Sequence, residues 1–320
     1  MLAGIAIIFL IGIIWMFVGI VYSYSTRDKS QFVLFMISFY LLYTVISFAC
    51  PCLIEMICPE YKLVAPLSKV SWKELFNLSL FIVPSALFSS AGFFMFSIAI
   101  RKGPLSVAWG IMQSAIVLPF LATWLIFKDN VNLISIIGMT IILLSLYFIV
   151  KGKQLNAENN DVTCRTKTFL WLAFAAFLGN GISQTCSLLP NKFTIFFPGE
   201  TDFSSELMAW RVPITALSGL VVWVIIGFAV KMRVSLKQWK NGLTYAAIVF
   251  IGQTLLYIAI DILSKYKLSG IVFPLAMGFC IVQFSIYCVI VKHERLHYFE
   301  KLGLGVLTIG LFTQALATIF

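Results

Sequence analysis

The amide side chains that lie inside long apolar stretches of this sequence, where polar groups are rare, include Gln113, Asn180, Gln184, Gln253 and Gln283. An amide without a partner is costly in an apolar environment, so each must face protein, water or a bound molecule. Asn180 and Gln184 are four residues apart and therefore lie on one face of a helix. These amides predict hydrogen bonding to a polar solute, and hydrogen bonds between helices are the alternative interpretation.

Aromatic side chains accompany the amides. Trp109, Tyr257 and Tyr287 could stack on a flat or ring-shaped solute that the amides orient. Gln253, Tyr257 and Asp261 follow the spacing i, i+4, i+8, which places them along one stripe of a helix. We therefore expect a binding site built from uncharged polar groups and rings.

Charged residues are few in the apolar stretches. Arg211 is followed by a long run without charge. We expect it to face the protein interior, with Glu206, a backbone carbonyl or an anionic substrate group as its partner; extension to the lipid headgroups is the alternative. Glu206 and Asp261 are the carboxylates we consider for coupling to a proton or sodium ion.

Groups that perform catalysis are scarce. Both histidines, His293 and His297, lie in one connecting segment, and the apolar stretches hold no paired carboxylates, so a membrane enzyme is not favoured. Cys50-Pro51-Cys52 resembles a thiolate pair for Cu(I), but small apolar cysteines beside a helix-ending proline are the preferred interpretation. We expect no metal and no cofactor, and without a nucleotide-binding loop ATP is not the direct energy source.

The composition indicates an integral membrane protein. Hydrophobic residues make up 61% of the chain, charged residues 11%, and the mean hydropathy is +0.99, whereas about a quarter of a soluble domain is charged. Backbone polar groups find no partners in lipid, so each apolar stretch must be helical. Ten stretches are long enough to span a bilayer: 2–22, 31–54, 75–99, 104–127, 131–150, 168–189, 206–230, 242–262, 268–291 and 302–320.

The chain divides into two similar halves. The pair of stretches in 98–152 recurs in degraded form in 258–320, with Leu105-Ser106 aligned to Leu268-Ser269 and Gly138 to Gly303. We expect a first five-helix repeat at 1–153, a cytoplasmic linker at 154–167 and a second repeat at 168–320. An odd number of spans per repeat inverts the second copy, so the expected fold is all-α, with ten helices in two inverted repeats and a site near the membrane midplane.

Positive charge predicts the orientation. Most of the 23 Lys and Arg residues fall in connections after odd-numbered spans. These connections are therefore expected in the cytoplasm and both termini outside a cell (inner) membrane. The net charge of +10 is explained by this orientation and by contact with anionic headgroups, so we expect no nucleic-acid partner.

The layout resembles the drug/metabolite transporter superfamily, and within it the L-rhamnose-proton symporter and related sugar uptake proteins. The resemblance rests on the segment from Ile100 to Gly110 that opens span four, on the basic connection after span one, and on the polar span six followed by Pro190-Asn191-Lys192. It implies a secondary transporter, a monomer or homodimer, with proton or sodium symport as one mode of coupling.

We therefore expect alternating-access transport of a small neutral or zwitterionic polar metabolite, with a sugar-like molecule favoured. The expected pocket is lined by spans three, four, six, eight and nine. Export or flipping of another metabolite class, such as an amino acid, a drug or a lipid-linked precursor, is the alternative within the same superfamily.

Overall fold

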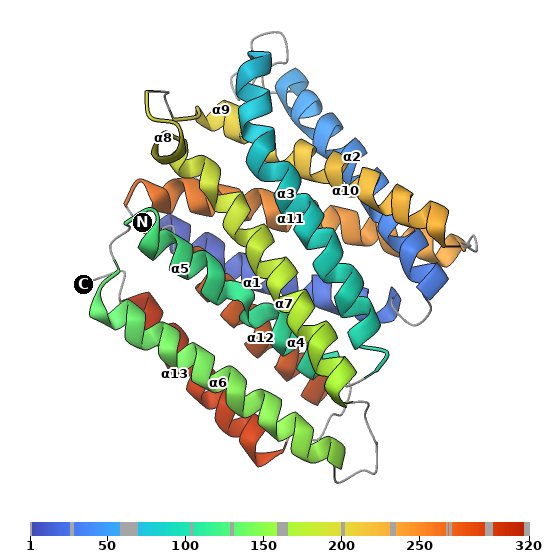
Figure 1. The fold of residues 1–320 in the computed structure, drawn as a ribbon, viewed down its shortest axis with the longest axis vertical. Coiled ribbons are helices and arrows are strands. Elements are labelled where there is room, and N and C mark those ends of the chain that lie inside the picture. The colour runs from blue at the N-terminus through green and yellow to red at the C-terminus, as the bar shows by residue number, and fades with distance from the viewer. Residues whose placement is uncertain are drawn as a thin grey trace.

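The computed structural model describes residues 2–25, 29–57, 70–102, 105–128, 131–158, 166–199, 202–230, 235–266, 268, 271–291 and 297–316. Every one of the ten apolar stretches is helical in the part described, and the described secondary structure is entirely helical. The protein is therefore an all-α, multi-pass membrane protein. Figure 1 shows the long helices packed beside one another in a bundle.

The described part of the first half of the chain contains six α-helices. They are α1 (Leu2–Ser25), α2 (Lys29–Ile57), α3 (Trp72–Ala99), α4 (Leu105–Gln113), α5 (Val117–Leu125) and α6 (Leu133–Glu158), with the 3-10 turn η1 (Ser114–Ile116) between α4 and α5. The second half contains α7 (Thr166–Leu188), η2 (Leu189–Lys192), α8 (Phe193–Phe196), α9 (Ser205–Met208), α10 (Arg211–Ala229), α11 (Leu236–Ser264), α12 (Val272–Ile290) and α13 (Tyr298–Leu316).

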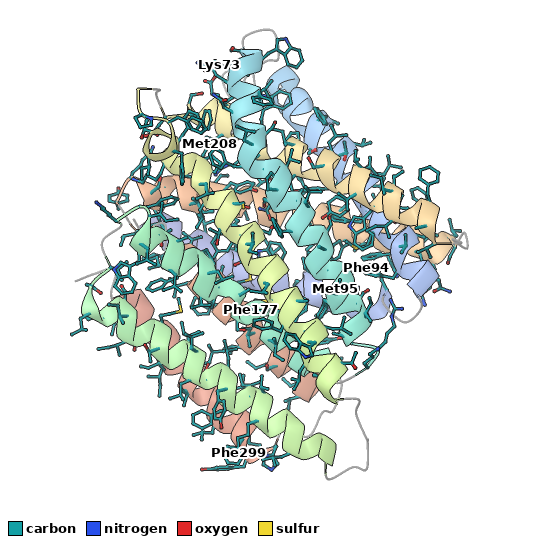
Figure 2. All side chains as sticks on the ribbon, in the orientation of Figure 1. Lys73, Phe94, Met95, Phe177, Met208 and Phe299 are labelled. Carbon is teal, nitrogen blue, oxygen red and sulfur yellow. The ribbon has the colours of Figure 1, made fainter. Side chains whose placement is uncertain are left out.

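Seven segments of the described chain are long and apolar enough to cross a membrane, and three shorter apolar helices account for the other stretches. Large apolar side chains cover the outside of the bundle, among them Phe228 and Trp171, which are 87% and 73% exposed. Figure 2 shows such side chains projecting from the outer helix faces. Hydrocarbon is the solvent that accommodates a surface of this kind.

Two spans are interrupted. The fourth is divided by η1 into α4 and α5, and the seventh begins with the short α9 and a turn before α10. Pro119 contributes to the first interruption, because it lacks the N–H that would bond to the carbonyl of Ala115. Hydropathy could not show the first break, since it lies in apolar sequence, whereas the second lies between Glu206 and Arg211 inside a stretch predicted as one span.

Several helices extend beyond the predicted apolar stretches. The sixth α-helix continues to Glu158, inside the predicted linker, and α11 begins at Leu236 rather than at 242. Hydropathy reports only the part of a helix that suits hydrocarbon, whereas polar residues can continue the helix into water. Residues 159–165 of the linker lie outside the described part of the chain.

Each half packs extensively against the other. The neighbouring pairs are α3 with α7, α1 with α11, α1 with α12, α4 and α5 with α7, α2 with α10, α2 with α11, α3 with α10, and α6 with α13. Figure 1 shows α6 and α13 side by side, and α3 beside α7. The core therefore lies between the two halves, and so does the space available for a ligand.

Candidate functional site

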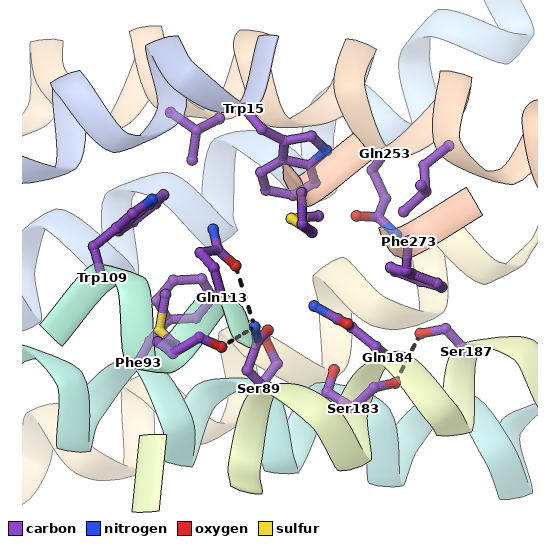
Figure 3. A pocket seen from close by; sticks show the side chains of 15 residues that line it. Trp15, Ser89, Phe93, Trp109, Gln113, Ser183, Gln184, Ser187, Gln253 and Phe273 are labelled. Atoms are coloured by element: carbon purple, nitrogen blue, oxygen red, sulfur yellow. Dashed lines mark hydrogen bonds between the residues drawn. The ribbon is translucent and has the colours of Figure 1, made fainter. Parts of the chain in front are cut away.

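A cavity of about 80 Å³ lies among α1, α3, α4, α7, α11 and α12. The close view in Figure 3 shows amide, hydroxyl and aromatic side chains pointing into it from these helices. The described residues that line it include no ionisable group. The cavity thus offers hydrogen-bonding groups and apolar surface, but no formal charge.

Five residues singled out from the sequence line this cavity. They are Trp109 and Gln113 of α4, Asn180 and Gln184 of α7, and Gln253 of α11. They come from three helices that are far apart in the chain, so the fold alone brings them together. All five spans predicted to line the pocket contribute to the cavity, and α12 of span nine supplies Phe273 and Met277.

Asn180 connects α7 to the interrupted fourth span. Its Nδ2 donates to the backbone carbonyl of Met112 at 3.2 Å and to Oε1 of Gln113 at 3.4 Å. Both acceptors lie at the end of α4, where the helical hydrogen-bond pattern changes in η1. The Asn180 amide therefore supplies a donor to a carbonyl at the break and holds Gln113 beside the cavity.

Glycines explain how Asn180 reaches this position. A methyl group on Gly179 would lie 2.7 Å from the Cα of Gly92, and one on Gly181 would lie 2.5 Å from a methyl group of Leu118. The backbone of α7 therefore touches α3 on one side of Asn180 and α5 on the other. Larger residues at these two positions would separate the helices and move the amide away from its acceptors.

Gln184 is 7% exposed, and its Oε1 has no hydrogen-bond partner within the described residues. A buried carbonyl oxygen without a donor is unfavourable, because it has lost water and gained nothing in return. Figure 3 shows the Gln184 side chain directed into the cavity. This oxygen is a ready acceptor for a donor on a bound molecule.

Three serine hydroxyls form a cluster beside Gln184. The Ser85 hydroxyl donates to the Ser183 carbonyl at 2.9 Å and lies 2.9 Å from Oγ of Ser187. Ser183 and Ser187 line the cavity, whereas Ser85 joins them from α3. Hydroxyl groups rotate and can donate or accept, so this wall of the cavity adapts to either kind of ligand group.

Sequence reasoning missed the contribution of α1. Trp15 and Val18 line the cavity, and the buried Nε1 of Trp15 has no acceptor among the described residues. An indole N–H in the middle of an apolar span was a usable signal, because such a donor normally finds a partner. Phe93 of α3 was also missed, since an apolar ring in a membrane helix carries no signal of its own.

The structure places two predicted residues of α12 outside the cavity. Gln283 is six residues beyond the cavity-lining Met277, which turns its side chain to another face of the helix. Its Oε1 is buried without a partner among the described residues. Tyr287 packs near Phe284, with the ring centroids 6.1 Å apart.

Arg211 lies in a second polar cluster, also outside the cavity lining. It is fully buried, and its NH2 group donates to both Asp261 oxygens at 2.9 and 3.1 Å. Its NH1 donates to Oδ1 of Asn191 at 2.9 Å, and its Nε donates to the Met208 carbonyl at 3.0 Å. The ring of Tyr257 lies 4.1 Å from the guanidinium carbon, a cation–π contact.

This arrangement settles the environment of Arg211. The expectation of an interior position with a backbone carbonyl partner is confirmed, and the alternative of extension to the headgroups is wrong. The carboxylate partner is Asp261 rather than Glu206, which is exposed on α9. The sequence separation of 50 residues between Arg211 and Asp261 concealed the pairing.

No group of three or more His, Cys, Asp or Glu side chains able to hold a metal ion occurs within the described residues. Cys50 and Cys280 are free thiols there. The amides, hydroxyls and rings that line the cavity can form hydrogen bonds and stacking contacts.

Comparison with known proteins identifies the fold but no family. No family model matches the sequence, and no curated protein matches it. A solved structure described only as "Crystal structure of protein" is similar over 99% of both chains, with a TM-score of 0.63 and 13% sequence identity. At that identity the likeness concerns the helical architecture alone.

Proposed function

We propose that this protein is a secondary transporter of the drug/metabolite transporter type, which moves a small neutral or zwitterionic polar metabolite by alternating access. A sugar-like molecule is the favoured substrate. The observation that carries the proposal is the cavity among six helices, into which Gln184 directs a buried oxygen that has no partner among the described residues. A cavity between helices whose polar groups await partners is suited to binding a solute within the membrane.

The packing of the helices supports an internal repeat of five spans, and an odd number of spans would invert the second copy. When the spans of one half are exchanged for their counterparts in the other, neighbouring pairs become other observed pairs: α3 with α7 becomes α11 with α1, and α4 with α7 becomes α12 with α1. The six helices that line the cavity are also unchanged as a set by this exchange, because α1, α3 and α4 are the counterparts of α7, α11 and α12. Transporters with such repeats bind substrate where the repeats meet and rock one against the other.

The lining supports an uncharged or charge-balanced substrate. Recognition of a phosphorylated solute at this depth would call for several Arg or Lys donors, because its charge must be desolvated. The described lining instead offers amides from Gln113, Gln184 and Gln253 and hydroxyls from Ser183 and Ser187. The rings of Trp15 and Trp109 provide apolar faces on which a sugar ring could stack.

Coupling to a proton or sodium ion forms part of the proposal. Of the two carboxylates considered from the sequence, Asp261 is held in the bundle by Arg211, whereas Glu206 is exposed on α9. Asp261 contacts η2 and α10 through Asn191 and Arg211. It is therefore better placed than Glu206 to couple ion binding to movement of the helices. Asp261→Asn should then uncouple uptake from the ion gradient, which is measured as loss of accumulation with exchange retained.

Thermal denaturation of the purified protein against a panel of metabolites tests the substrate class. A ligand present at 100 times its dissociation constant adds about 2.7 kcal/mol of stability. We expect a neutral hydroxylated metabolite to raise the denaturation temperature. Tight binding of a sugar phosphate would overturn the proposed class.

The same assay tests the site. In Gln184→Ala and Asn180→Ala, a substrate hydroxyl loses its partner, which should weaken binding by roughly 1–3 kcal/mol, or about 5- to 150-fold. Gln238→Ala is the matched control, because Gln238 is also a buried amide but does not line the cavity. Unchanged affinity in both cavity variants would show that the site is misplaced.

A further inference from the structure

Arg211, Asn191 and Asp261 form a closed hydrogen-bonded group, which we name the Arg211 network. Asn191 bridges the two charges, because its Oδ1 accepts from Arg211 and its Nδ2 donates to Oδ1 of Asp261 at 3.1 Å. The network joins three separate elements, η2, α10 and α11. Each member holds the other two, so the three elements are tied at one point.

The network lies one to two helical turns beyond the cavity. Asn191 follows the cavity residue Ser187 by four positions, and Asp261 follows Gln253 by eight along α11, which corresponds to about 12 Å of helix. Tyr257 lies between Gln253 and Asp261 on the same helix and stacks on Arg211. The network therefore occupies the layer between the cavity and the end of the bundle at which α11 finishes.

Exposure changes across this layer. The Arg211 side chain is 1% exposed, whereas that of Asp261 is 32% exposed. The ion pair thus reaches from the surface at this end of the bundle into its interior. A solute travelling from that end along α11 towards Gln253 would meet the Asp261–Arg211 pair first.

The elements that the network joins have little other contact near it. Packing between α10 and α11 is slight compared with the packing of either helix against α2. Among the described residues, the side-chain hydrogen bonds between α10 and α11 are those from Arg211 to Asp261. Separating these elements would therefore break few interactions besides the network itself.

We infer that the Arg211 network is a gate on one side of the cavity, closed when the ion pair is formed and open when η2 and α10 separate from α11. This inference rests on the proposed transport function. A charge pair suits a gate because opening admits water, and hydration of the separated charges offsets the attraction that is lost. A purely apolar contact at the same place would have no such compensation.

Thiol labelling of a cavity residue in the purified full-length protein tests the gate. The reporter is Ser187→Cys in a chain whose seven native cysteines are replaced, labelled with a positively charged, water-soluble thiosulfonate. The gate variant is Arg211→Met with Asp261→Leu, which removes both charges and leaves neither unpaired. We expect labelling to become about tenfold faster, equivalent to roughly 1.4 kcal/mol of lost preference for the closed state.

Two further variants make the outcome specific. Asn191→Ala leaves the ion pair in place and should give a smaller acceleration. Gln31→Leu with Gln238→Leu removes an interhelical amide pair at the opposite end of α11 and should leave the labelling rate unchanged. An unchanged rate in the charge-free chain, or equal acceleration in the amide control, overturns the gate. Labelling uses no substrate, so this failure is distinct from a lack of stabilisation by any metabolite.

Discussion

The cavity lies between two ends of the bundle that are built from different chemistry. Along α11, Asp261 lies eight residues beyond the cavity residue Gln253, and Tyr245 lies eight residues before it. On the Asp261 side the contacts are an ion pair and an amide bridge. On the Tyr245 side they are stacked and edge-on aromatic rings.

The aromatic end is densely packed. Tyr22 lies between Phe32 and Phe96, with ring centroids at 5.6 and 5.3 Å, and Tyr245 meets Phe39 edge-on at 4.7 Å. All five side chains are at most 4% exposed. Polar contacts there include one between uncharged groups, in which the amide of Gln238 donates to Oε1 of Gln31 at 3.2 Å.

The two ends should respond differently to amino-acid substitutions. Ring packing depends on shape and is distributed over many contacts, so single polar deletions there cost little and added volume costs more. A buried ion pair depends on both partners, so removal of one partner costs far more than removal of both. The Arg211 end is thus suited to switching between two states, and the aromatic end to remaining intact.

The largest effect is expected for Asp261→Leu alone. The substitution leaves Arg211 buried without its carboxylate, which should reduce the free energy of unfolding by about 3–5 kcal/mol. Chemical denaturation in detergent provides the measurement. The double variant Arg211→Met with Asp261→Leu should recover most of the loss. If the single variant is as stable as the parent protein, the charged end does not differ from the aromatic end in this way.

Arg211→Lys should have the next largest effect. Lysine keeps the charge but has no planar fork, so it cannot serve the Met208 carbonyl, Asn191 and both Asp261 oxygens together. The loss of a hydrogen bond that involves a charge predicts about 1.5–3 kcal/mol of destabilisation. Equal stability of the lysine variant would show that charge alone, without geometry, maintains the network.

Gly242→Ala tests the aromatic end by adding volume. A methyl group there would meet the Ser38 hydroxyl and lie 3.0 Å from the backbone nitrogen of Phe39. Overpacking of this kind should cost about 1–3 kcal/mol in denaturation experiments. Gly305→Ala is the control, because nothing lies within 4 Å of a methyl group at that position. Equal effects of the two substitutions would contradict a shape-dependent aromatic end.

Gln238→Leu should have the smallest effect. It removes one hydrogen bond to Gln31, but it also removes an Oε1 that has no partner among the described residues. Polar contacts between membrane helices contribute about 0.6 kcal/mol on average, so the change in unfolding free energy should be no larger. A loss comparable to that of Asp261→Leu would remove the distinction between the two ends.

The sequence predicted the helices well because the solvent imposes them. In hydrocarbon each apolar stretch must satisfy its own backbone, so ten stretches gave ten helical regions. It failed at η1, where the sequence stays apolar, and at the turn before Arg211, which falls inside a stretch predicted as one continuous span. Contacts from other helices, such as that of Asn180 with Met112, help to accommodate the first break.

Part of the candidate site was also readable from the sequence. Gln113, Asn180, Gln184 and Gln253 stood out because amides are costly in apolar stretches, and the cavity brings these four together. Gln283 carried the same signal but lies on another helix face. The cost of burying an amide does not indicate which neighbouring group will hydrogen-bond to it. Trp15 joined the site only because α1 packs against α11 and α12.

By itself, the sequence determined that the chain enters a membrane as helices and which side chains must find partners there. Both follow from local energetics, the desolvation of backbone and amide groups, which need no knowledge of neighbours. The tertiary structure alone decided which partners they find. Arg211 pairs with Asp261 rather than with Glu206, which is nearer in the sequence, because the fold places the start of α10 beside the end of α11.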